Sequence, residues 1–450
     1  MNGLRDFLNL EQEKGITHIE EPLNPKHEIP ALLKALDGGT PVLFEAIEGY
    51  SVKVLAGVCG SRRNICAALG VGVSELTERL SDATRNPVPC SVLEDPMGQM
   101  VEGRLNLGDI PILTHYDRDQ GPYITSAIVH AESLDGTREN VSFHRFNVLD
   151  EKTMSIRIQT GHLSRLMDEA REAGEEHIDV AISLGLHPAV MLAGASHAPY
   201  GLSEFEIANN LLGGDLTLFK CPHVDAKAPT DAELVIEGKI SLHDKAVEGP
   251  YVCLTGTWKE AGLQPVVEVV GVMHREDYVY QALLPASSEH KFLEGIPNEA
   301  RVWDKVRRVV PEVKGVNMTL DGCSWLHAVV SIKKVSELDT EKVIMATFEA
   351  IPAIKHVVVV YSDISPYDLE QVEWSIATRF QGDRDMIIIP ETYASGLDPS
   401  SDTDKKIGCK VGFDATRPLS KSGEDFRRGE IPVSERVKQV IECRTRLHEP

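Results

Sequence analysis

The chain lacks several features that would assign it to a common class of protein. None of its eight cysteines forms a CxxC pair, which argues against a thiolate metal site and a disulfide framework. No apolar run reaches transmembrane length, and the N-terminal MNGLRDFLNLEQEKG is typical of an amphipathic helix rather than a signal peptide. Neither a GxGxxG nor a Walker sequence is present, which disfavours dinucleotide and ATP enzymes. We therefore expect a cytoplasmic protein that does not associate with membranes.

Positive charge is also scarce. The chain has 46 basic and 69 acidic residues, a net charge of -23. Binding to nucleic acid or to an anionic membrane requires clustered lysine and arginine, so neither is expected, whereas a small anionic ligand in a local pocket remains compatible. With 450 residues, 42% hydrophobic and 26% charged, the composition predicts a folded protein of two or three domains.

The pattern of apolar residues divides the chain into three regions. Residues 1–110 mix short helices and strands, as expected for an N-terminal α/β domain. Residues 111–300 are rich in short strands and predict an antiparallel barrel interrupted by one helix at 163–173. The strands are expected at 124–130, 141–149, 154–159, 180–184, 233–240, 251–255 and 266–274.

Residues 301–430 return to an α/β pattern. The nearly continuous apolar run HVVVVYSD (356–363) is typical of a strand buried in a parallel sheet. Residues 431–450 predict a C-terminal arm with one helix at 434–444, suited to contact another subunit. The other elements expected here are helices at 302–311, 341–350 and 368–377 and strands at 315–320, 327–334 and 386–390.

The stretch from Asn140 to His162 carries polar residues where a simple core hairpin would not. It contains two strand-like runs joined by a turn at 150–152. The first run brings Asn140, His144 and Arg145 within six residues, which offers an amide, an imidazole and a guanidinium. An ordinary amphipathic hairpin with one solvated face would also fit this pattern.

Six motifs, taken in order, resemble the UbiD family of reversible decarboxylases. They are NVSFHR (140–145), QTGH (159–162), GLSEF (201–205), PTDAELVIEGKI with its EGPY follower (229–251), LHAVVSIKK (326–334) and GFDAT (412–416). The resemblance covers nearly the whole chain. It implies an α+β multidomain subunit, with an N-terminal α/β piece, a central split β-barrel like that of flavin reductases, and a C-terminal α/β domain.

The same resemblance implies prenylated FMN as cofactor, with a divalent metal, Mn²⁺ or Mg²⁺, and often potassium at the flavin phosphate. The implied metal ligands are Asn140, His162 and Glu204. Amide oxygen, imidazole and carboxylate suit such an ion. Taken alone, His162 would more commonly be a core or helix-capping histidine.

The family's acid–base network falls on Arg145, Glu233 and Glu237. Arg145 would orient the substrate carboxylate, Glu237 would transfer the proton and Glu233 would hold Arg145. In a regular strand the two glutamates lie on one face about 13 Å apart. Two solvated glutamates on an exposed face are the alternative. Because Asn140 and Arg145 point to opposite faces of a regular strand, we also expect an irregularity between Val141 and His144.

The flavin itself is expected against the small-residue loop GASHAP (194–199), with Ser196, His197, Gln159 and Arg145 lining it. An ordinary Gly-Ala-Pro loop is the alternative for that segment.

The implied reaction is non-oxidative decarboxylation of an α,β-unsaturated acid. The region 283–290 has no aromatic wall, and shorter family members that this chain resembles act on trans-anhydromevalonate 5-phosphate in the modified mevalonate route. His144, Arg157 and Lys239 would then hold the phosphate. Alternatives are a decarboxylase of aromatic or cinnamic-type acids, a non-catalytic flavin-binding barrel, and a metal-dependent hydrolase using His162 and Glu204. The expected partners are a flavin prenyltransferase, which supplies the cofactor, and further copies of the chain in a homodimer or dimer-based oligomer.

Overall fold

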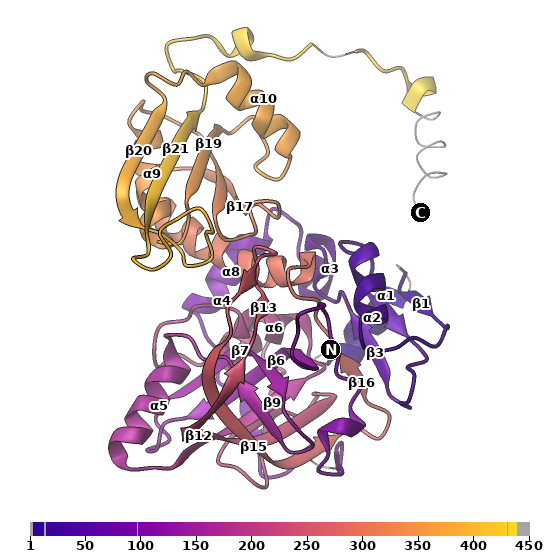
Figure 1. Cartoon of the computed structure of the whole chain (residues 1–450). Helices are drawn as coiled ribbons and strands as arrows, with labels where there is room; N and C mark the ends of the chain where they lie inside the picture. Colours follow the sequence, from indigo (N-terminus) through magenta and orange to yellow (C-terminus); the bar gives the residue numbers. More distant parts are fainter. Residues whose placement is uncertain (1–2, 13–14, 97, 430, 439–450) are drawn as a thin grey trace.

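The computed structural model describes the chain except for residues 1–2, 13–14, 97, 430 and 439–450. Three units follow one another along the sequence, and helix α8 (Ser288–Val306) lies between the second and the third (Figure 1). No helix in the described part of the chain is long and apolar enough to cross a bilayer.

The N-terminal unit is a four-stranded sheet with helices. Its strand order is β1-β2-β3-β16, and β16 (Val279–Gln281) arrives from more than 200 residues later to pair in parallel with β3. Ser61 caps α3 by accepting a hydrogen bond from Asn64 N, as its side chain allows. The other elements are α1 (Leu4–Gln12), β1 (Thr17–Ile19), α2 (Glu28–Ala35), β2 (Val42–Phe44), β3 (Lys53–Ala56), α3 (Arg62–Leu69) and α4 (Leu76–Arg85).

The central unit is a closed barrel of six antiparallel strands, which confirms the predicted architecture. The order is β12-β9-β6-β7-β8-β15, and pairing of β12 with β15 closes the ring. Alternate residues such as Phe146, Val180 and Ile236 fill one core. The strands are β6 (Tyr123–Glu132), β7 (Glu139–Val148), β8 (Thr153–Ile156), β9 (His177–Leu184), β12 (Leu234–Glu248) and β15 (Gly262–His274), with β5 (Val101–Glu102) at the edge of β15.

The predicted helix at 163–173 is α5 (His162–Ala173). Two further helices, α6 (Pro188–Gly194) and α7 (Glu204–Leu211), were not predicted. α6 is buried along its whole length and so has no polar face that would reveal a helical period, and α7 is only eight residues long. A small sheet of β4 (Ser91–Leu93), β10 (Thr217–Lys220) and β11 (Lys227–Pro229) follows, and β13 (Tyr251–Val252) and β14 (Trp258–Lys259) form a hairpin.

The expected irregularity between Val141 and His144 is wrong. β7 pairs with β6 without a break from Glu139 to His144. The extra residue lies in β6 instead, between Ile124 and Ala127, opposite Arg145. There Thr125 and Ser126 turn their hydroxyls to the carbonyls of Leu283 and Gln281, which accommodates the bulge.

The C-terminal unit is a five-stranded sheet of order β17-β18-β19-β21-β20. Helices α8 and α9 cover one face, and α10 covers part of the other. The predicted helix at 302–311 is the end of the longer α8. The elements are β17 (Val313–Met318), β18 (His327–Ile332), α9 (Asp339–Ala350), β19 (His356–Tyr361), α10 (Leu369–Arg379), β20 (Met386–Tyr393) and β21 (Ile407–Ala415). Of the predicted helix 434–444, residues 435–438 are helical and residues 439–444 lie outside the described residues.

One buried ion pair joins the N-terminal unit to α8. Arg62 Nη2 of α3 lies 2.5 Å from Glu299 Oε1 of α8, and both side chains are largely buried. Met318 N of β17 donates to the same oxygen at 3.0 Å, and the Tyr367 ring lies 4.7 Å from the guanidinium. This contact therefore links α3 of the N-terminal unit to α8, β17 and Tyr367.

We expect Arg62→Leu to lower the free energy of unfolding by roughly 3 to 5 kcal/mol, because Glu299 would stay buried without its cation. The double variant Arg62→Leu/Glu299→Leu should lose less, since no unpaired charge remains. Urea unfolding followed by tryptophan fluorescence measures this, as Trp303, Trp325 and Trp374 all lie in α8 or beyond. Lys220→Met, which removes an exposed pair with Glu94, is the control. A double variant as unstable as the single one would contradict the explanation.

Candidate active site

The central feature of the barrel exterior is a buried pair, Arg145 of β7 and Glu248 at the end of β12. Arg145 Nε and Nη2 donate to the two carboxylate oxygens at 2.7 and 3.0 Å. The guanidinium lies 3.8 Å from the centre of the Tyr251 ring. Burial alone would lower the pKa of Arg145, but the hydrogen bonds to Glu248 raise it, so the arginine stays charged. The two hydrogen bonds therefore hold both side chains in one relative orientation.

Aromatic side chains enclose this pair. Tyr123 and Tyr251 have ring centroids 5.0 Å apart, and Tyr123 Oη accepts a hydrogen bond from Gly249 N at 3.1 Å. Burial raises the pKa of both phenols, so they remain neutral. His290, in the first turn of α8, is close enough for the charge of Arg145 to contribute to its lowered pKa, after burial as the main cause.

The structure does not bring Glu233 and Glu237 to Arg145, so the expected Glu233–Arg145 contact is wrong. Glu237 lies near the start of β12 and Glu233 directly before it, whereas Glu248 is the last residue of that strand. Their alternative as solvated residues is equally wrong, because both are buried.

Each of the two has a structural partner elsewhere. Glu233 accepts from Arg5 Nε and Nη2 at 2.7 and 2.8 Å and from Val279 N at 3.0 Å, which joins α1 and β16 to the barrel. It packs on Gly185, where a Cβ would lie 2.2 Å from the Glu233 Cβ. Glu237 accepts from His223 N at 2.7 Å and contacts His223 Nδ1 at 3.1 Å.

Two of the three predicted metal ligands, His162 and Glu204, lie next to each other, and Glu204 also contacts the backbone of the residue after Asn140. Glu204, the first residue of α7, is 2% exposed. Its Oε1 lies 3.9 Å from His162 Nδ1 at the start of α5, and its Oε2 accepts from Val141 N at 2.9 Å, directly after Asn140. The 3.9 Å gap is too long for a hydrogen bond, yet shorter than two metal–ligand bonds of about 2.1 Å.

A chain of hydrogen bonds orients the Asn140 amide. His144 Nδ1 must donate to the carbonyl of Arg157 at 3.1 Å, so His144 Nε2 accepts from Ser142 Oγ at 3.0 Å. Ser142 Oγ then accepts from Asn140 Nδ2 at 2.8 Å. This chain of hydrogen bonds occupies Nδ2 of Asn140, so Oδ1 is the side-chain atom that is available to a cation.

The donor set fits a divalent cation. Burial raises the pKa of Glu204 to about 8, and within the described part of the chain no lysine or arginine is paired with this carboxylate. A bound cation would stabilise the ionised carboxylate of Glu204 and so offset the effect of burial. Burial and nearby Arg165 lower the pKa of His162, which favours the neutral imidazole that metals bind.

The predicted cofactor loop lies at the junction of the barrel and the C-terminal unit. The His197 ring is 6.5 Å from the ring of Trp325, across that junction. Ser196 Oγ donates to Ala193 O at 2.6 Å. Gln159 is exposed in the segment between β8 and α5. These positions leave Ser196, His197 and Gln159 able to face a cofactor near His162.

The residues expected to hold a phosphate do not form one site. His144 and the backbone of Arg157 serve the chain that orients Asn140. Lys239 lies on β12 with its Nζ 4.0 Å from Asp179 of β9. The prediction of a phosphate site from these three side chains is therefore wrong.

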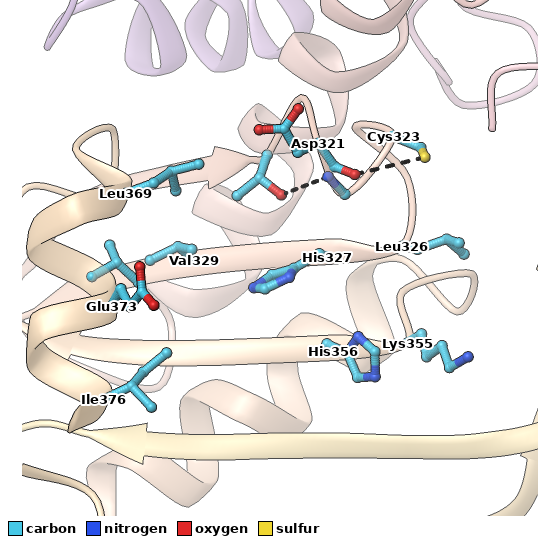
Figure 2. A pocket seen from close by; sticks show the side chains of 13 residues that line it. Asp321, Cys323, Leu326, His327, Val329, Lys355, His356, Leu369, Glu373 and Ile376 are labelled. Carbon is cyan, nitrogen blue, oxygen red and sulfur yellow. Dashed lines mark hydrogen bonds between the residues drawn. The ribbon is translucent and has the colours of Figure 1, made fainter. Parts of the chain in front are cut away.

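A cavity of about 520 Å³ opens in the C-terminal unit, and none of the predicted site residues lines it. Figure 2 shows His327 and His356 in it on β18 and β19, beside Leu369, Glu373 and Ile376 of α10. Burial lowers the pKa of His327 to about 4. Lys355 at its rim is paired with Asp398 at 2.9 Å. This cavity has no arginine and is separate from the Arg145 cluster.

Sequence reasoning missed Glu248, Tyr251 and His290 as neighbours of Arg145. The EGPY motif contains two of them, but the local pattern offered no reason to prefer Glu248 over Glu233 or Glu237. His290 lies in a helix whose first turns were not predicted. Only the closure of the barrel brings these residues together.

Comparison with known proteins identifies the family. Three family models match: the 3-octaprenyl-4-hydroxybenzoate carboxy-lyase N-terminal domain at 8–84, its Rift-related domain at 91–288 and its C-terminal domain at 291–415. Anhydromevalonate phosphate decarboxylase of Methanothermobacter thermautotrophicus is 38% identical over 94% of this chain and 99% of its own. That of Methanosarcina mazei is 37% identical over 95% and 99%.

Solved structures give the same result. The UbiD-class enzyme HmfF from Pelotomaculum thermopropionicum, in complex with FMN, has a TM-score of 0.93 and 40% identity, and covers 98% of this chain and 99% of its own. An evolved dimeric form of HmfF in complex with prenylated FMN has a TM-score of 0.88 and 39% identity, with coverage of 96% and 97%. Given the matched domains and the site described above, this chain belongs to the UbiD family and is a carboxy-lyase.

Proposed function

We propose that this chain is a prenylated-FMN-dependent decarboxylase of an α,β-unsaturated acid, specifically trans-anhydromevalonate 5-phosphate. The observation that carries the proposal is the buried Arg145–Glu248 pair stacked on Tyr251. The names of the relatives at 37–38% identity support the substrate, and the HmfF complexes support the flavin.

Arg145 is suited to orient the substrate carboxylate. Its Nε and Nη2 face Glu248, so the Nη1 edge of the planar fork is the part that a substrate carboxylate would meet. Tyr251 covers the guanidinium and excludes water, which strengthens that contact. Held in this way, the carboxylate is presented in a single orientation.

Decarboxylation replaces the lost CO₂ by a proton, so the site must deliver one to the carbon. We assign this transfer to Glu248, in place of Glu237, because Glu248 is the carboxylate that contacts Arg145. His290 is a second group that can bear a proton here. Its Nδ1 accepts from Ala286 N at 3.1 Å, which places the hydrogen on Nε2.

Asn140, His162 and Glu204 would hold Mn²⁺ or Mg²⁺, with potassium nearby, and the ion would anchor the flavin phosphate beside Ser196, His197 and Gln159. When bound, the prenylated flavin supplies the electron sink for the bond to CO₂. The chain's own part is to place the substrate, exclude water and move the proton.

Two variants separate the possible proton donors. We expect Glu248→Gln to lower kcat by about a hundred- to ten-thousandfold, because it removes both a titratable group and the counter-ion of Arg145. Glu237→Gln should have a much smaller effect, since its partner is His223. Both are measured with protein loaded with prenylated FMN, with flavin occupancy checked by absorbance. The opposite order of effects would return the role to Glu237.

His290 should make stability depend on pH. Burial lowers its pKa to about 4, whereas the unfolded imidazole titrates near 6.5. The unfolded chain therefore binds more protons between these values, so this contribution is present above pH 6.5 and is lost as the pH falls toward 4. The stability gap between the wild type and His290→Gln should narrow by roughly 2 kcal/mol from pH 7.5 to 5. Urea midpoints measure the gap, with exposed His243→Gln as control, and an unchanged gap would contradict a buried neutral imidazole.

The substrate is tested by CO₂ release. Anaerobic protein, co-expressed with a flavin prenyltransferase, is given trans-anhydromevalonate 5-phosphate and a panel of cinnamic, hydroxybenzoic and furoic acids. We expect turnover of the phosphate alone. Turnover of an aromatic acid instead would keep the chemistry and reject the substrate, and no turnover with bound prenylated flavin would favour a non-catalytic flavin-binding barrel.

We also expect the chain to act in the cytoplasm as a homodimer or a dimer-based oligomer, with its cofactor made by a separate prenyltransferase. An HmfF form is described as dimeric, which supports this expectation. Light scattering of the purified chain gives its assembly state.

A further inference from the structure

A second polar cluster lies directly beside the three proposed metal ligands. It consists of His130 and Glu132 of β6, Glu139 at the start of β7, and Lys227 at the start of β11. The ligand atoms of His130, Glu132 and Glu139 all lie within 4.8 Å of one another, the spacing expected of a metal site. The chain supplies the cation itself, however, because Lys227 Nζ lies 2.8 Å from both Glu132 Oε1 and Glu139 Oε2.

The cluster has one consistent pattern of hydrogen bonds. Lys227 N donates to His130 Nδ1 at 3.0 Å, so the ring hydrogen is on Nε2. That atom faces Glu139 Oε2 at 3.2 Å. Glu139 therefore receives hydrogen bonds from an imidazole and an ammonium group, and its side chain is held in one position.

This fixed carboxylate reaches the other side of the metal site. Ser203 Oγ, at the N-cap of α7, donates a hydrogen bond to Glu139 Oε1. The His130 ring stacks on Phe205 with centroids 5.6 Å apart. Ser203 and Phe205 flank Glu204, whereas Glu139 and Val141 flank Asn140. The chain neighbours of both proposed ligands, Asn140 and Glu204, therefore make the contacts between β6, β7 and the first turn of α7.

We propose that Glu139, held by Lys227 and His130, is a positioning residue that sets the distance between the Asn140 amide oxygen and the Glu204 carboxylate. The inference rests on the proposed metal triad. Groups outside the coordination sphere that fix ligand geometry affect metal affinity about ten- to a hundredfold. No residue of the cluster touches the ion or the substrate in this assignment.

The test is the affinity for Mn²⁺ of FMN-loaded protein stripped with a chelator, measured from the electron paramagnetic resonance signal of free Mn²⁺. Lys227→Met and Ser203→Ala should each weaken binding at least about tenfold. Lys220→Met is a matched control, because Lys220 is the register partner of Lys227 on β10 and pairs with Glu94 instead. Ser203→Thr keeps the hydroxyl and should bind Mn²⁺ with an affinity close to that of the wild type. Thermal midpoints are measured in parallel. If Mn²⁺ affinity fell only because the protein was less stable, the loss of affinity would correlate with the loss of thermal midpoint, and not with the absence of the hydroxyl at position 203.

The outcomes separate this inference from the triad on which it rests. Glu204→Gln should abolish tight Mn²⁺ binding, and if it does not, the triad itself is wrong. If Glu204→Gln abolishes binding but Ser203→Ala and Lys227→Met bind like Lys220→Met, the triad stands and the positioning role is rejected. A second Mn²⁺ bound by Lys227→Met would also reject it, because the cluster would then be an ion site. If Lys227→Met does not fold, Ser203→Ala decides, as it removes one oxygen atom only.

Discussion

The pairing of β12 with β15 is the constraint on which the rest of the structure depends. It closes the six strands into a ring, so that one long strand, β12, runs from the N-terminal unit to the junction with α8. Register shifts between Glu237 and Gly238 and between Ile240 and Lys245 allow the strand to bend with the barrel. Because of this closure, the start of β12 joins α1 and β16, and its end, Glu248, meets Arg145 on β7.

Buried charge is handled in two different ways in this molecule. Where a carboxylate has only a structural role, the chain provides its cation or donors: Arg5 for Glu233, and Arg62 for Glu299. Glu204 has a backbone donor and a neutral imidazole but no such cation among the described residues, so burial raises its pKa. The metal ion proposed above would offset the cost of this buried carboxylate, since an ionised group without a counter-ion is destabilised by burial.

The same reasoning separates the two clusters of His and Glu side chains. Around Glu139 the positive charge is a lysine that belongs to the fold, whereas around Glu204 the proposed metal ion would supply it. The two clusters share the strand β7 and the first turn of α7, so the ion pair of Lys227 and Glu139 would help to define where the proposed metal ion binds. Arg145, five residues from Asn140 on an unbroken strand, then faces the other side of the sheet.

The sequence by itself determined the succession of α/β and strand-rich regions and the barrel, because strand alternation is a local pattern. The metal triad stays a prediction that rests on the family resemblance of motifs such as QTGH and GLSEF. The sequence also placed Arg145 on a strand with polar neighbours. The partner of Arg145 was decided only by the tertiary structure. Glu233, Glu237 and Glu248 have the same chemistry and lie on one strand, and what distinguishes them is the position along β12 that barrel closure brings next to β7. Helix α6 was likewise decided by packing, since a helix buried on all sides carries no amphipathic period that a sequence can show.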